Sequence, residues 1–539
     1  MFRVERVWRN VGRIRIRIPV LIAVAFVPVG LSGCASWYAH LAELEGNRIR
    51  DEKLSEVAAF RRERLIDPRE LAGSSRSKRV APVELPPVVT LKEAIRIASE
   101  HNRDYQTERE TLFIRALELG LVRRDFLRPV FSGSIAYEGS DRRRRQYSDV
   151  TSLSLGGSQI FRTGGTVSVD AGALIARDPN VSGPEQSSST EIGVSVRQPL
   201  LRGAGGEVSF EQLTRTEREL LYDARAFELF RQDFVVSTID DYYGLVVQKK
   251  QLENTRARIV QQRRAVEQAE ALFLAGRGSK LDSFRAEQSL LRAQSTALAA
   301  EQTFRFAFDR FKIRLGLPID VDFDIVDEVP EPEPIDIDVE RALPAALHNR
   351  LDLATVRDRV EDRERAVRIA RNSLLPDLTV GVSYGLESEV DSSFRGLRHD
   401  ADNPLGVSAV LEIPLDRRAE RNDYRVALIQ RTQSRRELER AEDDVITEVR
   451  DAIRRLERSR EQIELGVREI ASFEQSVEKA QIDLEAGRIT NRDLVEARDD
   501  LTNALNDQLE RKAQYEISRL ELLRVVGILF VDEEGEVRR

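Results

Sequence analysis

The sequence predicts a mainly α-helical protein with a smaller β part, built from two tandem repeats. Three observations carry this prediction. One residue in three is charged while only 6% are aromatic, which is typical of long helices with exposed faces. Two stretches, 207–274 and 416–485, are expected to be single helices, each of about 70 residues and on the order of 100 Å long. The same order of segments also occurs twice along the 539 residues.

Two alignments of the chain with itself define the repeats. In the first, His101-Asn102-Arg103 aligns with His348-Asn349-Arg350, and in the second the turn at Gly276 aligns with the turn at Gly487. An acidic, proline-rich stretch between the copies suits neither a helix nor a buried strand. The predicted division is a signal peptide at 1–33, a lipidated N-terminal segment at 34–89, a first repeat at 90–317, a linker at 318–336, a second repeat at 337–528 and a C-terminal tail at 529–539.

Each repeat follows one plan: a helix, a strand region, a very long helix, a turn and another helix. Thr90 and Glu93 open the first helix with a capping-box pattern. Apolar residues alternate with Gly and Ser at period two from Phe131 and again from Leu378, which predicts strands. The half-length helices near 90–127 and 282–316 together match one long helix. We therefore expect them to be stacked end to end, antiparallel to it.

The first repeat contains an extra alternating segment at 151–175, interrupted by the short turn RTGG. Membrane barrels have short turns on one side and longer loops on the other, which this spacing fits. We therefore expect about six strands per chain rather than four. The alternative is that this hairpin packs outside a four-stranded contribution.

The N-terminus has the pattern of a signal peptide. Residues 1–33 contain six Arg and one Glu, followed by an apolar run of about 14 residues that is too short to span a membrane comfortably. Leu31-Ser32-Gly33-Cys34 resembles the lipobox of bacterial lipoproteins, in which Cys34 becomes the acylated first residue. Ala35 after it implies release to the outer membrane. The alternative is an uncleaved anchor helix with an incidental cysteine.

Composition and motifs exclude several classes of function. The formal net charge of −8 does not favour nucleic acid as a partner. Because Cys34 is the only cysteine, disulfides within the chain, thiol catalysis and cysteine-ligated metals are excluded. His101 and His348 occupy equivalent repeat positions and are interpreted as surface or capping residues, so we predict no metal site. The glycines in 203–206 lack a following Gly-Lys-Ser/Thr and predict a strand-to-helix connection. We predict no cofactor and no enzymatic activity.

The doubled plan resembles the TolC-like outer membrane efflux protein family over nearly all of residues 90–528. The resemblance is carried by the repeated Gly-x-x-[Ser/Thr]-x-x-Asp turns, the Pro-Leu strand ends, and Leu315-Gly316-Leu317 with its counterpart Val526-Gly527-Ile528. It implies a homotrimer whose strands close one β-barrel in the outer membrane and whose helices form an α-barrel tunnel across the periplasm. It further implies a passive duct that receives substrates from an inner-membrane pump through a periplasmic adaptor protein. Closure by several chains agrees with the cost of open strand edges in lipid.

The resemblance assigns the repeated turns to periplasmic tips, where the adaptor docks and the tunnel narrows. The docking residues it implies are Gly276, Arg277, Ser279, Asp282, Gly487, Arg488, Thr490 and Asp493. The implied gate adds Glu496, and in a threefold assembly the carboxylates of Asp282, Asp493 and Glu496 are expected to form cation-favouring rings. Leu484 and Ile489 replace the Tyr and Arg ties of the family, so carboxylate coordination or apolar packing is expected to close the mouth. The alternative is that both aspartates only cap helices.

Two other functions remain as alternatives. One is a non-conducting structural envelope lipoprotein, against which the recurring Gly/Ser-rich strands argue, because a tether does not need them. The other is a duct dedicated to the export of one protein or polysaccharide. The run RRRR at 142–145 is interpreted as a solvated loop, with binding of acidic lipopolysaccharide as the alternative.

Overall fold

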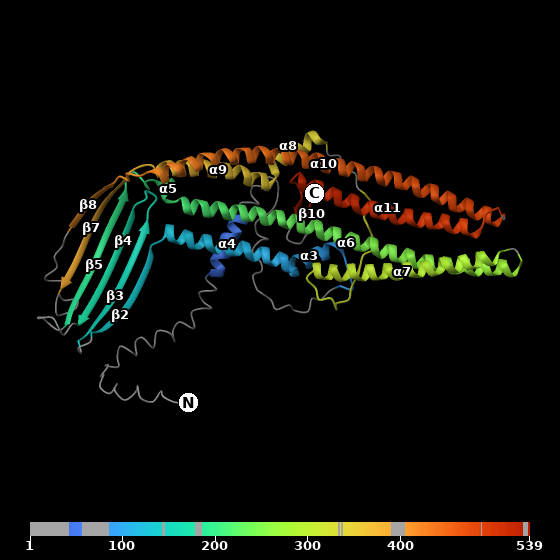
Figure 1. Ribbon diagram of the computed structural model, residues 1–539, viewed down its shortest axis with the longest axis horizontal. Helices are drawn as coiled ribbons and strands as arrows, with labels where there is room; N and C mark the ends of the chain where they lie inside the picture. Colours follow the sequence, from blue (N-terminus) through green and yellow to red (C-terminus); the bar gives the residue numbers. More distant parts are fainter. Residues whose placement is uncertain are drawn as a thin grey trace, which may run out of the picture.

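The computed structural model describes residues 42–55, 86–142, 146–177, 186–276, 278–332, 335, 338–389, 405–486, 488–531 and 537–538. The described chain is elongated, with a β-sheet at one end and two helical hairpins at the other (Figure 1). Helices of both repeats run side by side between these ends.

The helices reproduce the predicted plan twice. In the first repeat they are α3 (Leu91–His101), α4 (Arg103–Leu127), α5 (Gly206–Ser209), α6 (Glu211–Leu274) and α7 (Lys280–Arg314). In the second they are α8 (Val339–Asn349), α9 (Leu351–Asn372), α10 (Arg418–Glu485) and α11 (Asn491–Val525). α6 has 64 residues and α10 has 68, which at about 1.5 Å per residue gives lengths near 100 Å. α7 folds back along α6, and α11 along α10.

The single helix expected near 90–127 is in fact two helices separated at Asn102. The Asn102 side-chain oxygen accepts the Tyr105 N–H at 3.0 Å, and its amide donates to the Arg314 carbonyl at 2.8 Å. The first bond caps α4 and the second fixes the end of α7 against the break. As predicted, α4 and α7 then continue one another along α6 (Figure 1).

Glycine is required where the end of α7 turns against this break. Gly316 has φ of 76°, and an added Cβ would lie 2.1 Å from the His101 carbonyl oxygen. Gly527 has φ of 75° at the equivalent point of the second repeat, where a Cβ would lie 3.1 Å from the carbonyl carbon of Asn349. Leu315-Gly316-Leu317 and Val526-Gly527-Ile528 therefore seat each returning helix against the helix break of its own repeat.

The main sheet contains six antiparallel strands in the order β2-β3-β4-β5-β7-β8. Their bounds are β2 (Val130–Arg142), β3 (Gln146–Ile160), β4 (Thr166–Arg177), β5 (Gln186–Pro199), β7 (Asp377–Glu389) and β8 (Leu405–Glu412). The extra segment forms most of β3 and β4 in the interior of this sheet. The prediction of six strands is therefore confirmed, and the alternative of a hairpin packed elsewhere is wrong.

The two faces of the sheet differ in chemistry. Cross-strand register and the alternation of side chains place one set of apolar residues on one face: Phe131, Ile135, Leu153, Val169, Val194, Val382 and Val407. The opposite face is rich in Ser and Gly, with Leu174 and Val410 among its apolar residues. It also carries charged side chains: Glu138, Asp170, Glu191, Arg197, Glu387 and Glu412. Ser134 and Ser154 share a hydrogen bond of 2.8 Å on that face, and Ser168 and Ser195 one of 2.7 Å.

Three apolar clusters hold the helical body together. The largest lies where α3, the middle of α6 and the end of α7 meet, and includes the buried Tyr242 and Leu315. A second joins α8, α10 and α11, and a third joins α4 and the start of α6 near the sheet. The linker crosses the first cluster, because β6 (Asp324–Ile325) pairs in parallel with β1 (Val88–Val89). A short antiparallel pair, β9 (Phe530–Val531) with β10 (Val537–Arg538), follows α11.

Candidate functional site

The first tip joins α6 to α7 at the end of the molecule opposite the sheet. Gly276 continues the chain past α6 with φ of 69°, and its N–H donates to the Phe273 carbonyl at 3.0 Å. Ser279 then caps α7 by accepting the Leu281 N–H at 3.1 Å, while the Asp282 carboxylate accepts the Ser279 N–H at 3.3 Å. The predicted tip residues are therefore a glycine helix end and a capping box.

The second tip repeats this arrangement between α10 and α11. One carboxylate oxygen of Asp493 accepts both the Thr490 N–H at 2.8 Å and the Thr490 hydroxyl at 2.7 Å. These bonds hold the pKa of Asp493 below its ordinary value. Arg488 lies 3.2 Å from the Asp483 carboxylate, so its guanidinium stays on its own hairpin.

The predicted gate residues contact side chains of their own tips. The Asp282 carboxylate lies 3.8 Å from Arg285, and the Glu496 carboxylate lies 3.9 Å from Arg492 one turn earlier. Leu484 and Ile489 are half-buried, on either side of the second turn. Asp282 and Asp493 therefore cap the first turns of α7 and α11. A cap at this position does not prevent either carboxylate from also facing a neighbouring copy in an assembly. Arg277, Gly487 and Cys34 lie outside the described residues, as do Arg143, Arg144 and Arg145.

Sequence reasoning missed a polar tie between the hairpins, behind the tips. Arg258 of α6 is ion-paired with Asp499 of α11, and nearby the amide of Asn254 donates to Asn506 at 2.5 Å. Burial raises the pKa of Asp499, although Arg258 acts in the opposite direction. These residues belong to long charged helices whose sequence does not indicate which charges face a partner. The tie connects the two repeats where the tips could separate.

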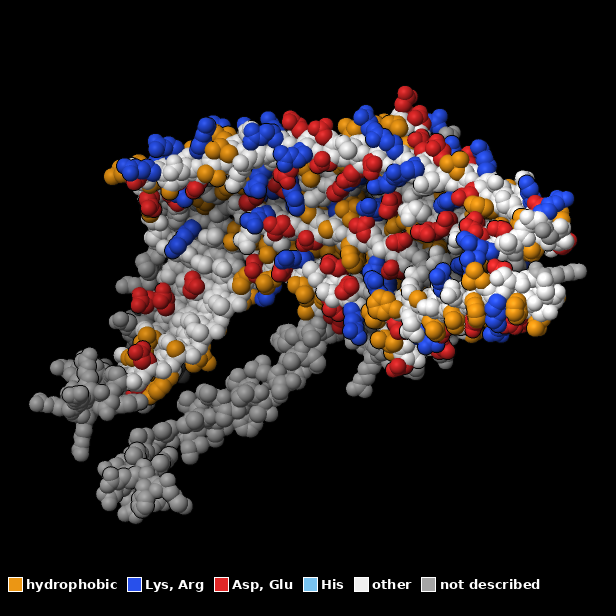
Figure 2. Space-filling view, turned by 45° about the vertical axis from the view of Figure 1, so that its right-hand side comes forward, with side chains coloured by type: hydrophobic (Ala, Val, Ile, Leu, Met, Phe, Trp, Pro, Cys, Tyr) orange, Lys and Arg blue, Asp and Glu red, His pale blue; other side chains and the backbone are white. Residues whose placement is uncertain are grey.

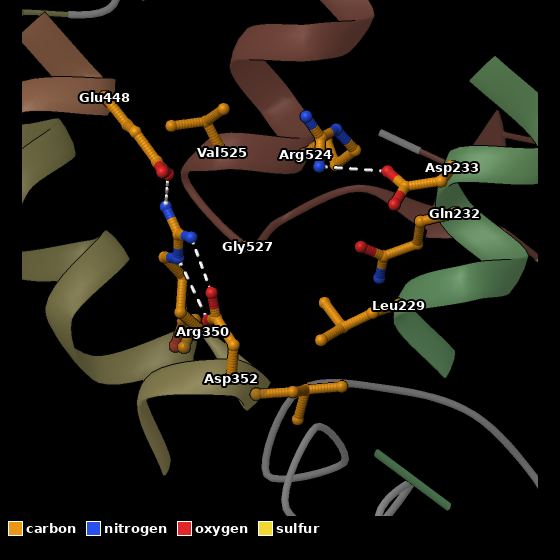
Figure 3. A pocket seen from close by; sticks show the side chains of 11 residues that line it. Leu229, Gln232, Asp233, Arg350, Asp352, Glu448, Arg524, Val525 and Gly527 are labelled. Atoms are coloured by element: carbon orange, nitrogen blue, oxygen red, sulfur yellow. Dashed lines mark hydrogen bonds and ion pairs between the residues drawn. The ribbon is translucent and has the colours of Figure 1, made fainter. Parts of the chain in front are cut away.

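A second charged group lies at the break between α8 and α9, beside a pocket of ≈ 180 Å³ (Figure 3). Arg350 makes a bidentate contact with Asp352 at 2.6 and 3.0 Å and also pairs with Glu448 of α10. Across the pocket Arg524 lies 2.9 Å from Asp233. Burial alone would raise the pKa of Asp352, but pairing with Arg350 outweighs it, and the pKa is lowered. Because these charges are already paired with one another, we assign them no ligand. They connect the helices of the two repeats instead.

Exposed apolar residues form a stripe along α7. They recur about every seven residues, the spacing at which a second helix packs against the first: Leu281, Phe284, Leu291, Leu298, Phe306 and Ile313, each more than half exposed. Ile114 and Leu121 extend the stripe on α4. Apolar side chains gather along the lower edge of the helical body, over α7, among the interspersed charges of the surface (Figure 2).

The opposite lateral edge of the molecule is formed by α9 and α10 (Figure 1). It also exposes apolar residues, among them Val426, Ile429, Leu465 and Val467 of α10. The two edge strands of the sheet lie on the same two sides of the molecule. β2 follows α4 on one side, and β8 leads into α10 on the other. Each lateral side therefore carries one open strand edge and one partly apolar helical edge.

Within the described part of the chain, no helix has the length and apolarity that crossing a membrane requires. The same residues contain no cluster of three or more His, Cys, Asp or Glu placed to hold a metal ion. His101 instead has its Nδ1 3.2 Å from the Ile97 carbonyl, at the end of α3.

Residues 342–528 match the family model described as outer membrane efflux protein. The second repeat, which contains this match, is therefore similar to outer membrane efflux proteins. The likeness in fold also covers the first repeat, since solved channels of the same architecture align with 81% of the chain. The region matched by the family model contains all of α9, α10 and α11, the second tip, and α8 from Ala342 onward.

Similar proteins include secretion and channel proteins. The alkaline protease secretion protein AprF of Pseudomonas aeruginosa is 22% identical over 354 residues, which cover 62% of this chain and 69% of AprF. The CmeC outer membrane channel of Campylobacter jejuni aligns with a TM-score of 0.62 at 14% identity, over 81% of this chain and 85% of CmeC. The open-state MtrE outer membrane channel of Neisseria gonorrhoeae aligns with a TM-score of 0.58 at 14% identity, over 81% and 89%. These likenesses establish a TolC-like fold.

Proposed function

We propose that this TolC-like protein is the passive outer-membrane exit duct of a tripartite efflux or secretion system. The sheet is the observation that carries the proposal. Its one apolar face suits lipid and its Ser/Gly face suits water, while β2 and β8 at its edges have no further strand beside them among the described residues. Such a sheet is stable in a bilayer only when its edges are closed by pairing.

Closure by three copies of the chain fits both ends of the molecule. A copy placed beside this one would put its β8 next to β2 and its α9–α10 edge against the α4–α7 stripe. This head-to-tail contact is heterologous, and it forms a ring when the rotation between neighbouring copies closes. The stripe on α7 would then be covered by a neighbouring helix. The number three follows the family, and an adaptor and an inner-membrane pump are the partners that the family implies.

The tips are the surface that we assign to the adaptor. Leu274 at the end of α6 is 84% exposed, and Leu281 and Phe284 at the start of α7 are each more than half exposed. Lys280 lies over the rings of Phe273 and Phe284, at 5.2 and 5.1 Å from their centroids. An exposed apolar end rimmed by charges suits docking of another helical hairpin. Similarity to AprF favours polypeptide secretion as a second form of the same duct function.

A purified protein reconstituted in a planar bilayer should conduct ions, and the absence of discrete channel currents would rule the duct out.

We further expect acidic rings at the mouth, formed by Asp282, Asp493 and Glu496. Asp493→Asn combined with Glu496→Gln should reduce cation selectivity several-fold and weaken block by trivalent cations, because the negative potential at the mouth falls. Arg305→Ala, on the exposed face of α7, is a suitable control. Unchanged selectivity and block in the double variant would leave Asp493 with a capping role only.

Lipid anchoring at Cys34 is part of the proposal, supported by the basic region, the short apolar run and the sequence Leu31-Ser32-Gly33-Cys34. Cys34→Ala should abolish incorporation of labelled palmitate in a bacterial host, since no other cysteine is available. Ser36→Ala, two residues further on, should label normally. Equal labelling of the Cys34→Ala chain would contradict the assignment.

A further inference from the structure

We infer that this duct has an unusually wide exit: three chains close an eighteen-stranded barrel whose bore accommodates polypeptides that keep local structure. The inference rests on the proposed function and on the six strands of each chain. It concerns the class of cargo that the outer-membrane end can pass, which neither the family nor the fold assigns.

The two additional strands are part of the wall. β3 pairs with β2 along its length, β4 with β3, and β5 with β4, in continuous antiparallel register. The hairpin from Gln146 to Arg177 therefore lies between β2 and β5. The turn at its inner end is short, with Gly164 at φ of 87°. A hairpin inserted in this way lengthens the perimeter of the wall, since it cannot lie inside or outside the barrel without breaking these pairings.

The extra perimeter determines the width of the barrel. With strands about 4.8 Å apart and tilted by about 40°, eighteen strands give a backbone diameter of about 36 Å, compared with about 24 Å for twelve. The gain of about 12 Å equals the thickness of an α-helix with its side chains, roughly 10–12 Å. The wider barrel can therefore contain a helix or a hairpin beside an extended strand of cargo.

The water-facing side of the wall is rich in small residues, with acidic side chains such as Asp170 and Glu191 among them. Serines alternate along it: Ser134, Ser154, Ser168, Ser195, Ser383 and Ser408. Glycines lie between them in close contact, because a Cβ on Gly381 or Gly406 would lie 2.6 Å from the hydroxyl of Ser408 or Ser383. The part of the sheet seen in Figure 2 is mostly white, with scattered acidic side chains, a basic side chain and some apolar side chains towards the end away from the helices. Ser and Gly side chains protrude little and contain no apolar surface to which a moving polypeptide would adhere, so between the acidic side chains much of the added width is free for cargo.

The width is tested with uncharged polymers added on the outer side of a planar bilayer. We compare the full chain with a variant lacking residues 143–177, which joins β2 directly to the loop before β5 and leaves four strands. Polymers that enter the barrel lower its conductance, and polymers too wide to enter leave it unchanged. The largest polymer that still lowers the conductance should be about 1.5 times wider for the full chain than for the variant, in proportion to their strand numbers. Equal exclusion limits in two conducting proteins would overturn the inference while leaving the duct function intact. Absence of current in the full chain would instead overturn the proposed function.

Strand number is measured independently on the full chain by disulfide cross-linking between copies. Ser134→Cys on β2 is combined in turn with cysteines at 406, 408, 410 and 412, which lie on the same face of β8. At least one pair should give covalent trimers without larger species. A ladder that ends at the dimer would mean a twelve-stranded barrel, and no cross-link at any position would mean that β2 and β8 do not meet. Either result contradicts the eighteen-stranded exit, even if the deletion variant fails to fold.

Discussion

Replacing Gly316 by alanine is expected to destabilise the chain by about 3 kcal/mol or more. Its φ of 76° costs about 1–2 kcal/mol for a residue with a side chain. The added methyl group would also lie 2.1 Å from the His101 carbonyl oxygen and 2.8 Å from the Asn102 nitrogen, both of which are backbone atoms. Relieving such overpacking costs about 1–3 kcal/mol, because the break between α3 and α4 must move. Thermal unfolding in detergent, followed by the helical circular dichroism signal, measures the loss.

Two other glycines separate the cost of backbone strain from the cost of contact with the helix break. Gly276→Ala meets the same backbone strain at φ of 69°, but no atom lies within 4 Å of the added carbon. It should lower stability by about 1–2 kcal/mol at most. Gly527→Ala, with its nearest atom at 3.1 Å, should give an intermediate loss. If Gly316→Ala behaves like Gly276→Ala, contact with the helix break does not stabilise the fold.

Removing the tie between the hairpins, by Arg258→Ala, should raise single-channel conductance several-fold. Arg258 and Asp499 connect α6 to α11 behind the tips, and the side chain of Asp499 is only 19% exposed. Without the guanidinium, a half-buried carboxylate remains unpaired, which costs about 1–3 kcal/mol. Separation of the hairpins hydrates that carboxylate and widens the mouth. Conductance in planar bilayers measures the change.

The matched control is Arg305→Ala on α7. Arg305 pairs with Glu301 of the same helix at 2.6 Å, and its side chain is 67% exposed. A pair of this kind contributes only about 0.3–0.5 kcal/mol and holds no second element. Conductance should stay near the wild-type value in this variant. Equal conductance of both variants would show that the Arg258–Asp499 pair does not restrain the mouth.

Much of the fold could be predicted because its causes are local along the chain. The strands from Phe131 and Leu378 follow period-two alternation, and the extra hairpin followed from alternation around one short turn. Ser279 with Asp282, and Thr490 with Asp493, are capping boxes formed by residues three apart. Repetition of these local signals identified two copies of one plan and the positions of both tips.

Tertiary structure alone decided the features that depend on residues distant in sequence. Asn102 breaks the opening helix because its side chain reaches Arg314. In the same way Arg258 meets Asp499 only where two hairpins of different repeats lie together. In helices where one residue in three is charged, composition cannot indicate which charge is paired across an interface. That choice depends on the relative rotation and register of packed helices, which apolar clusters from both repeats fix together.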